Sequence, residues 1–112
     1  MIILEGSPIS TQHLYKNHGH IRFMTKEAKE LKESYQWQAK TQWKKPIIKG
    51  DVRVEIKLFF KDKRRRDWDN WHKVSCDALT GIVWEDDCQI QEAKVTKHID
   101  EKRPRIEIEV NG

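Results

Sequence analysis

The sequence predicts a small α+β domain, because two kinds of hydrophobic period occur in one short chain. A two-residue alternation runs through 52–60 and returns at 106–110, whereas a three- and four-residue spacing runs through 26–44. The chain has 112 residues, of which 37% are hydrophobic and 36% are charged, and this composition fills one small core. We therefore expect a single domain over residues 1–112, with four to five strands and two main helices.

Short apolar runs at the N-terminus predict two brief strands. Residues 2–4 are apolar and are closed by Gly6-Ser7-Pro8, which is typical of a strand that ends in a turn. Residues 21–24 form a second apolar run, and residues 10–20 between the two runs carry no clear period. We therefore expect a strand at each apolar run and leave the connection unassigned.

A long amphipathic helix is predicted over 26–44. Thr25 precedes a charged, proline-free stretch and can serve as its N-cap, and Pro46 lies beyond its expected end. The apolar positions recur on one side of this stretch, namely Ala28, Leu31, Tyr35, Ala39 and Trp43. This spacing predicts that one face of the helix packs on the core.

The remaining strands are predicted in the second half of the chain. Residues 52–60 alternate apolar and polar side chains after the turn at Gly50, and this is the clearest strand of the sequence. Residues 90–99 and 105–110 give two further strands, with Pro104 in their connection. A second helix is expected before Gly81, with Asp69 or Asn70 as its cap and with Trp71, Val74 and Ala78 on its buried side.

The cysteine content and the absence of long apolar runs indicate a cytoplasmic protein. No run of 18 apolar residues occurs, so we expect no membrane partner, and the N-terminus carries no readable secretory signal. Cys76 and Cys88 are too few for a disulfide framework and have no His or Cys at metal-binding spacing. Both are therefore predicted to be reduced thiols.

Charge is distributed unevenly along the chain, although the net charge is only +4. Residues 40–66 carry eleven basic and three acidic side chains, whereas residues 67–93 carry seven acidic side chains and one basic one. A basic block attracts a polyanion, and a carboxylate cluster beside it tolerates that polyanion when a divalent cation lies between them. The pattern is therefore compatible with metal-dependent chemistry on phosphate, and equally with a solvated surface of mixed charge.

Carboxylates near the second helix are the candidates for that chemistry. Asp67 and Asp69 are one residue apart before the helix, Lys73 and Asp77 follow at four-residue spacing, and Glu85-Asp86-Asp87 comes after the helix. Carboxylates without a dedicated Cys or His suit Mg²⁺ and argue against zinc, and the implied reaction is phosphodiester hydrolysis. The alternative is structural, with Asp69 as a helix cap, Lys73 and Asp77 as a salt bridge, and the second acidic group as a turn.

The same residues carry a resemblance to a known family. The run Asp67-Trp-Asp-Asn-Trp-His-Lys-Val-Ser-Cys-Asp-Ala-Leu79, followed by Asp86-Asp-Cys-Gln-Ile90, resembles the D-x-D-N-x-x-K-x-x-x-D-A-L and D-D-x-Q-[IV] pattern of RusA-like Holliday junction resolvases. At the N-terminus the Gly-x-Pro turn of that family is present, but Ser10-Thr11-Gln12 stands where its members have an Asn and a basic residue.

The resemblance implies an Mg²⁺-dependent endodeoxyribonuclease, with Mn²⁺ as a substitute and no small-molecule cofactor. Such an enzyme is a homodimer that resolves four-way DNA junctions by paired symmetric nicks in DNA recombination and repair, in a bacterium, phage or prophage. By position, Asp67, Asp69 and Asp87 correspond to the catalytic metal ligands and Lys73 to the catalytic lysine. The residues expected to support them are Asn70, Asp77, Asp86 and Gln89.

A basic segment immediately before the acidic pair is the predicted DNA-binding surface. Phosphates held by this segment would lie beside the metal. Its members are Lys61, Lys63, Arg64, Arg65 and Arg66. Two other functions stay open: a non-catalytic module that binds branched DNA, and a metal nuclease that acts on flaps, duplex or RNA.

Overall fold

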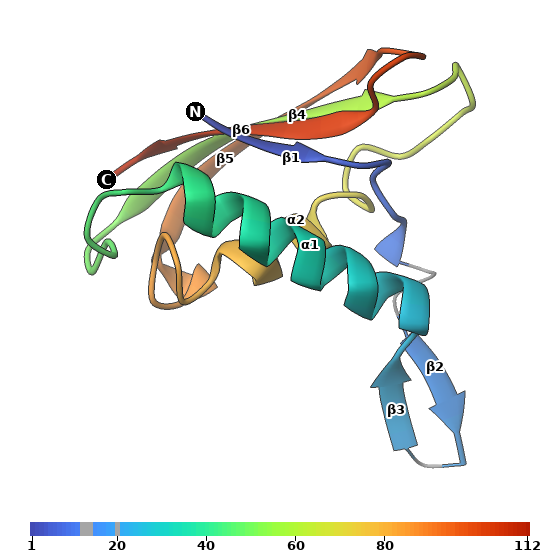
Figure 1. The fold of residues 1–112 in the computed structure, drawn as a ribbon, viewed down its shortest axis with the longest axis horizontal. Helices are drawn as coiled ribbons and strands as arrows, with labels where there is room; N and C mark the ends of the chain where they lie inside the picture. Colours follow the sequence, from blue (N-terminus) through green and yellow to red (C-terminus); the bar gives the residue numbers. More distant parts are fainter. Residues whose placement is uncertain (12–14, 20) are drawn as a thin grey trace.

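The α+β prediction is confirmed by a computed structural model, which describes residues 1–11, 15–19 and 21–112 (Figure 1). The elements follow the chain as β1 (Ile2–Glu5), β2 (Tyr15–His18), β3 (Ile21–Met24), α1 (Lys26–Gln42), β4 (Val52–Phe60), α2 (Lys73–Leu79), the 3₁₀ helix η2 (Asp87–Gln89), β5 (Ile90–Ile99) and β6 (Arg105–Asn111). No helix among these described residues is long and apolar enough to cross a membrane.

A four-stranded mixed sheet organises the molecule in the order β1-β6-β4-β5. β4 pairs antiparallel with β6 and parallel with β5. The parallel pairing is possible because the connection through α2 brings the chain back to the end of the sheet at which β4 begins. Both helices lie on one face of this sheet, and the separate β2–β3 hairpin projects beyond the N-terminal end of α1 (Figure 1). The start of β5 is thereby placed beside the start of β4, with Val52 opposite Ile90.

The core lies between the sheet and the helices. Alternate residues of β4 are buried from Val52 to Phe60, as the alternation predicts, and Ile106 and Ile108 of β6 continue the same surface. α1 covers it with Ala28, Tyr35 and Ala39, which are buried, and with Leu31, which is partly buried; Trp43, also partly buried, follows as the C-cap. The predicted apolar face of α1 is therefore confirmed, and Thr25 caps the helix through its hydroxyl and the Ala28 N–H.

The second helix differs from the prediction at its start. α2 begins at Lys73 with His72 as N-cap, and no side chain caps it, so the prediction of Asp69 or Asn70 as the cap is wrong. Both residues lie in the turn before the helix, where the Asn70 carbonyl accepts hydrogen bonds from Thr11. Their side chains are therefore not used for capping.

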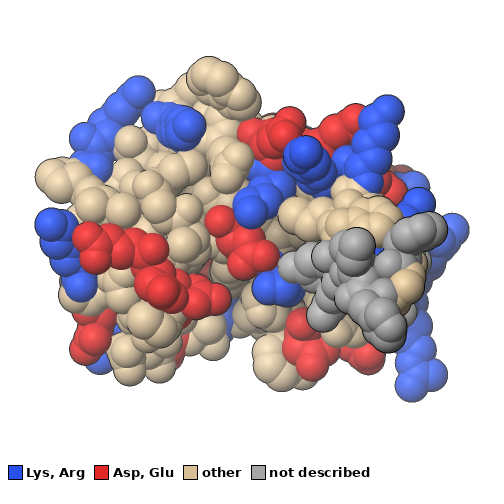
Figure 2. All heavy atoms as spheres, turned by 90° about the horizontal axis from the view of Figure 1, so that it is seen from below, with Lys and Arg blue, Asp and Glu red and all other residues tan. Residues whose placement is uncertain are grey.

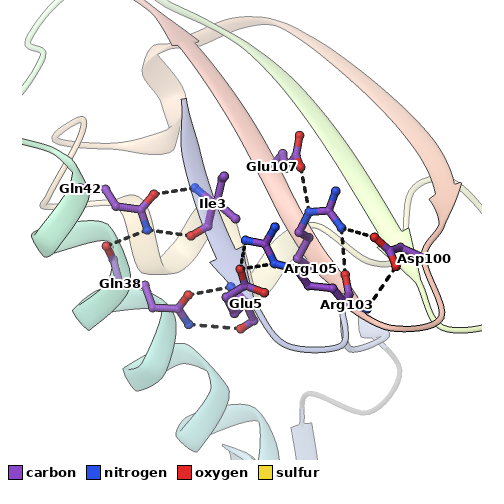
Figure 3. A network of polar contacts seen from close by, with 8 residues as sticks. All are labelled: Ile3, Glu5, Gln38, Gln42, Asp100, Arg103, Arg105 and Glu107. Carbon is purple, nitrogen blue, oxygen red and sulfur yellow. Dashed lines mark hydrogen bonds and ion pairs between the residues drawn. The ribbon is translucent and has the colours of Figure 1, made fainter.

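Two glutamines of α1 close the β1 edge of the sheet (Figure 3). The Gln42 amide accepts from the Ile3 N–H and donates to the Ile3 carbonyl, at 2.7 Å in both directions. The Gln38 amide does the same for Glu5, at 2.6 and 3.1 Å. These side chains take the place of a neighbouring strand and satisfy backbone groups that an edge strand leaves open.

Candidate active site

A cavity of about 400 Å³ lies between α2 and the inner face of β4 and β5. Its apolar floor is formed by strand residues, and polar residues from four segments of the chain form the rest of its lining. The floor residues are Val54, Ile56, Ile90 and Ala93; the others are Thr11, Asp69, Asn70, His72, Lys73, Cys76, Asp77 and Asp87. Five of the residues that the sequence pointed to therefore share one cavity.

Residues 67–70, here called the acidic loop, precede α2, and their Asp69 lines this cavity whereas Asp67 lies outside the lining. Both carboxylates are exposed, and Asn70 Nδ2 donates to Asp67 Oδ2 at 3.4 Å. Asp67 precedes the turn and Asp69 lies in it, so the alternation of an extended strand does not govern where the two side chains point. The paired grip expected of these two residues stays a prediction.

One face of α2 contributes Lys73 and Asp77. Their side chains form an ion pair of 3.3 Å, with 44% and 28% of each side chain exposed. The i,i+4 salt bridge of the structural alternative is therefore present. Both groups also line the cavity, so the salt bridge lies within the candidate site.

The 3₁₀ helix η2 fixes Asp87 just before β5. Asp86 Oδ1 accepts from the Cys88 N–H at 3.0 Å, and Gln89 Oε1 accepts from the Asp86 N–H at 2.8 Å, which makes a reciprocal cap. Gln89 Nε2 also donates to the carbonyls of Ile48 and Gly50, each at 2.8 Å. Asp86 and Gln89 thus position Asp87 through the backbone.

The neighbouring acids of η2 have unequal acidities. The Cys88 N–H holds the pKa of Asp86 below its ordinary value, because it stabilises the charged carboxylate. The pKa of Asp87 is raised, first by its hydrogen bonding with the Asp86 carboxyl, then by burial and by the charges of Asp86 and Asp77. A cation near Asp87 would relieve this repulsion.

The two cysteines are free. Burial raises the pKa of the Cys76 thiol to about 12, and the Asp77 charge adds to the shift. This shift favours the neutral thiol of Cys76 at neutral pH. The available charged donors of the cavity are therefore carboxylates.

The carboxylate donors fit a hard divalent cation. Within the part of the chain that the structure describes, no group of three or more His, Cys, Asp or Glu side chains is gathered closely enough to hold a metal ion. Mg²⁺ usually takes one or two carboxylates and completes its shell with water and substrate phosphate oxygens. Asp69, Asp77 and Asp87 line the same cavity, so one or two of these carboxylates could serve a cation there beside water and phosphate oxygens.

The basic segment after β4 is split by the fold. Lys61, Lys63, Arg64 and Arg65 are exposed. The Arg66 side chain is only 11% exposed: it pairs with Asp62 at 2.8 Å and lies 4.3 Å above the Phe60 ring. The contacts with Asp62 and Phe60 hold the Arg66 guanidinium against the protein. The DNA contact expected of Arg66 stays a prediction.

Acidic and basic side chains lie close together on the underside of the molecule. Figure 2 shows acidic side chains at the left and centre of this face, with Lys and Arg side chains on both sides of them. A second hollow of about 160 Å³ at the far end of β5 is lined mainly by cations and polar groups, namely Asp62, Lys63, Arg64, Arg66, Lys97, His98 and Ile99. The predicted juxtaposition of both charge signs is therefore present on the surface.

Several cavity residues were not predicted from the sequence. Thr11 reaches the site from the N-terminal segment, and no spacing within the acidic motif points to it. His72 and Cys76 lie inside the motif, at positions that carried no expected role. The apolar floor was predicted only as core, because alternation cannot show which core residues border a cavity.

Comparison with known proteins identifies the family of this chain. The family model for endodeoxyribonuclease RusA matches residues 5–111. This chain belongs to the RusA family. The membership that the acidic motif predicted is therefore confirmed.

Individual relatives carry the same family name. The crossover junction endodeoxyribonuclease RusA of Enterobacteria phage 82 is 40% identical over 74 residues, which cover 57% of this chain and 62% of the relative. The proteins of that name from Escherichia coli K12 and Shigella sonnei are each 38% identical over 60 residues, covering 53% of this chain and 50% of the relative. The chain thus spans about half to three-fifths of the length of the curated relatives it matches.

Proposed function

We propose that this RusA family member is a metal-dependent endodeoxyribonuclease that resolves four-way DNA junctions. The observation that carries the proposal is the convergence of Asp69, Lys73 and Asp87 on one cavity from three separate segments. The relatives are named crossover junction endodeoxyribonucleases, which favours the four-way junction over other DNA shapes. Carboxylates beside a cation are the groups that metal-assisted phosphodiester hydrolysis requires.

Asp67, Asp69 and Asp87 are the proposed metal ligands, with Mg²⁺ as the cation and Mn²⁺ as a substitute. Asp69 and Asp87 line the cavity, and Asp67 belongs to the same loop as Asp69. These residues would hold the cation, whose chemistry there would be to activate water for attack on the phosphate and to stabilise the leaving oxygen. Asp77 is a further carboxylate of the cavity and helps to set its charge.

The other proposed site residues contact the substrate or hold the proposed ligands in place. Lys73 balances charge on the scissile phosphate, and its ion pair with Asp77 holds the ammonium in the cavity until that phosphate arrives. Asp86 and Gln89 keep Asp87 in place through η2. Asn70 restrains Asp67, and the apolar floor limits the water near the reacting phosphate.

Four exposed cations, Lys61, Lys63, Arg64 and Arg65, bind the phosphates that flank the cleavage site, and Arg66 supports them. Binding should therefore weaken steeply as the salt concentration rises. A homodimer would present two such cavities related by a two-fold axis, which matches the symmetry of the junction and explains paired nicks. A DNA-resolving enzyme of this kind would act in the cytoplasm of its bacterial host.

Cleavage of labelled substrates tests this function. The purified protein is incubated with a four-way junction, a duplex and a single strand, in Mg²⁺ or in EDTA, beside Asp87→Asn. Glu85→Gln is the matched control, because it removes one negative charge two residues away and outside the cavity lining. We expect paired, Mg²⁺-dependent nicks on the junction with wild type and Glu85→Gln, and none with Asp87→Asn.

Two other results would replace the proposal. Junction binding that is unaffected by EDTA, with no cleavage of any substrate, would indicate a non-catalytic binding module. Metal-dependent cleavage that is faster on flaps or duplex than on the junction would keep the chemistry and change the substrate.

A further inference from the structure

The acidic loop is held at both ends through its backbone carbonyls. At its start, Lys97 Nζ donates to the Arg66 carbonyl at 2.6 Å. At its end, the Asn70 carbonyl accepts from the Thr11 N–H at 2.7 Å and from Thr11 Oγ1 at 2.9 Å. The segment that carries the two candidate ligands therefore lies between two anchors from distant parts of the chain.

The Thr11 anchor stands on a fixed support. Ile9 and Ser10 are 9% and 5% exposed, so the chain immediately before Thr11 is packed into the core. Further back, the Gly6 N–H donates to the Pro104 carbonyl at 3.2 Å, where the chain leaves β1. Movement of Thr11 relative to the sheet would disturb this packing, so the Asn70 carbonyl is held against a firm segment.

The acidic loop needs such a support because α2 does not provide it. His72, the N-cap of α2, makes no side-chain cap, and α2 is only seven residues long. The bond between Asn70 Nδ2 and Asp67 is long, at 3.4 Å. The two hydrogen bonds from Thr11 to the Asn70 carbonyl fix the peptide group between residues 70 and 71. Asp69 is the residue just before Asn70, so its backbone is restrained as well.

We propose that Thr11 is a positioning residue of the cavity, which holds the Asn70 carbonyl and thereby aims Asp69 at the metal. This inference rests on the proposed function, in which Asp69 is a metal ligand. Partners that orient ligands typically change metal affinity or activity by about 10- to 100-fold when they are removed. Thr11 itself lines the cavity. Loss of its hydroxyl should therefore lower both the metal affinity and the activity.

The test compares Thr11→Val, which keeps the shape and loses the hydroxyl, with Thr11→Ser, which keeps the hydroxyl. Thr41→Val is the matched control, because Thr41 Oγ1 also donates to a backbone carbonyl, that of Gln38, at 2.8 Å on α1. The readouts are kcat and KM on a four-way junction, Mn²⁺ affinity by titration calorimetry without DNA, and the midpoint of thermal unfolding.

We expect Thr11→Val to lower kcat and Mn²⁺ affinity by about tenfold, with KM changed by less than about twofold. Thr11→Ser should restore most of both, and Thr41→Val should leave both at the wild-type level. Thr11→Ala provides a second variant if Thr11→Val does not fold, and the same losses are expected from it.

Three results would overturn the inference. Wild-type kcat and Mn²⁺ affinity in folded Thr11→Val would show that the hydroxyl does not position Asp69. An increase in KM alone would make Thr11 a DNA contact, and equal impairment of Thr11→Ser would remove the hydroxyl from the explanation. Asp69→Asn is run beside them: its full activity would refute the ligand assignment itself, whereas its inactivity with a normal Thr11→Val would refute only the role of Thr11.

Discussion

The β1 edge of the sheet and the acidic cavity use polar side chains in opposite ways. At the edge, the amide oxygen and the amide nitrogen of Gln42 and of Gln38 each bond a backbone group of β1 (Figure 3). Nearby, Arg105 bonds Asp100 and Glu107 at 2.8 Å each, and Arg103 pairs with Glu5. In the cavity, by contrast, Asp69 and Asp87 line open space, and the Asp87 carboxyl hydrogen-bonds with another carboxyl, that of Asp86.

The difference separates residues that stabilise the fold from residues that we propose perform its chemistry. Polar groups with partners inside the chain contribute to stability, whereas carboxylates gathered without a cation repel one another and reduce it. Sites with such a cost are typical of functional surfaces. Substitutions in the cavity should therefore reduce cleavage and leave stability intact. Substitutions at the β1 edge should reduce stability and leave cleavage intact.

The largest expected effect is that of Asp69→Asn on cleavage. The change removes a proposed metal ligand and one negative charge that faces phosphate, so the cleavage rate should fall by about a thousandfold or more. Junction affinity should be unchanged or higher, and the free energy of unfolding should not decrease. Single-turnover cleavage, junction binding and urea unfolding measure the three quantities. Retained cleavage would remove Asp69 from the catalytic site.

Lys73→Ala should also act mainly on the rate. We expect the cleavage rate to fall by about a hundredfold, with a much smaller loss of junction affinity, because Lys73 is placed to meet charge that develops in the transition state. Lys63→Ala is the comparison, since Lys63 is an exposed cation that does not line the cavity with Lys73, and it should weaken binding and leave the rate at saturation unchanged. Equal losses of rate and affinity in Lys73→Ala would make Lys73 an ordinary phosphate contact.

Opening the β1 edge should change stability and leave the chemistry intact. The double variant Gln38→Ala, Gln42→Ala removes the amides that cover the backbone of Ile3 and Glu5. We expect the free energy of unfolding to fall by about 1–2 kcal/mol, because hydrogen bonds to β1 are lost. The loss stays small because the freed backbone groups are exposed and can bond water instead. The open edge should also self-associate as the protein concentration rises.

Urea unfolding and light scattering check this expectation. The control is Gln36→Ala, because this glutamine of the same helix lines a hollow beside β3. Junction cleavage per folded molecule should match wild type in both variants. A reduced cleavage rate in the double variant would show that the two regions are coupled.

The smallest effect is expected from Asp100 at acid pH. Its pKa is lowered, first by its hydrogen bond with Arg105 and then by the N–H groups of Arg103 and Lys102. A carboxylate whose pKa is lowered by folding stabilises the folded state above its unfolded pKa of about 3.9, and this contribution disappears as the pH falls through the folded value.

Asp100→Asn removes this titration, so its stability should fall less than that of wild type between about pH 5 and pH 3. Urea unfolding at both pH values measures the difference, and cleavage near neutral pH should be unchanged. An identical pH dependence in the two proteins would show that the Arg105 contacts do not stabilise the Asp100 carboxylate.

Regular periods in the sequence determined the main elements of the fold. The alternation of residues 52–60 predicts β4 with the bounds that the structure has, and the apolar spacing of residues 26–44 predicts the buried face of α1. The acidic motif likewise indicated the family and the residues Asp69, Lys73 and Asp87 of the cavity. Each of these signals comes from residues near one another in the chain, where the period records which side chains face the core.

Only the tertiary structure decided which distant residues meet. Thr11 contacts Asn70 across 59 positions of sequence, and Gln89 reaches the carbonyl of Ile48 across 41. The strand β2 falls in a stretch without a period, and Arg66, one of a run of similar cations, is the one turned against Phe60. These outcomes depend on how the sheet, the helices and the loops pack together, and no local window of sequence records a contact between segments so far apart.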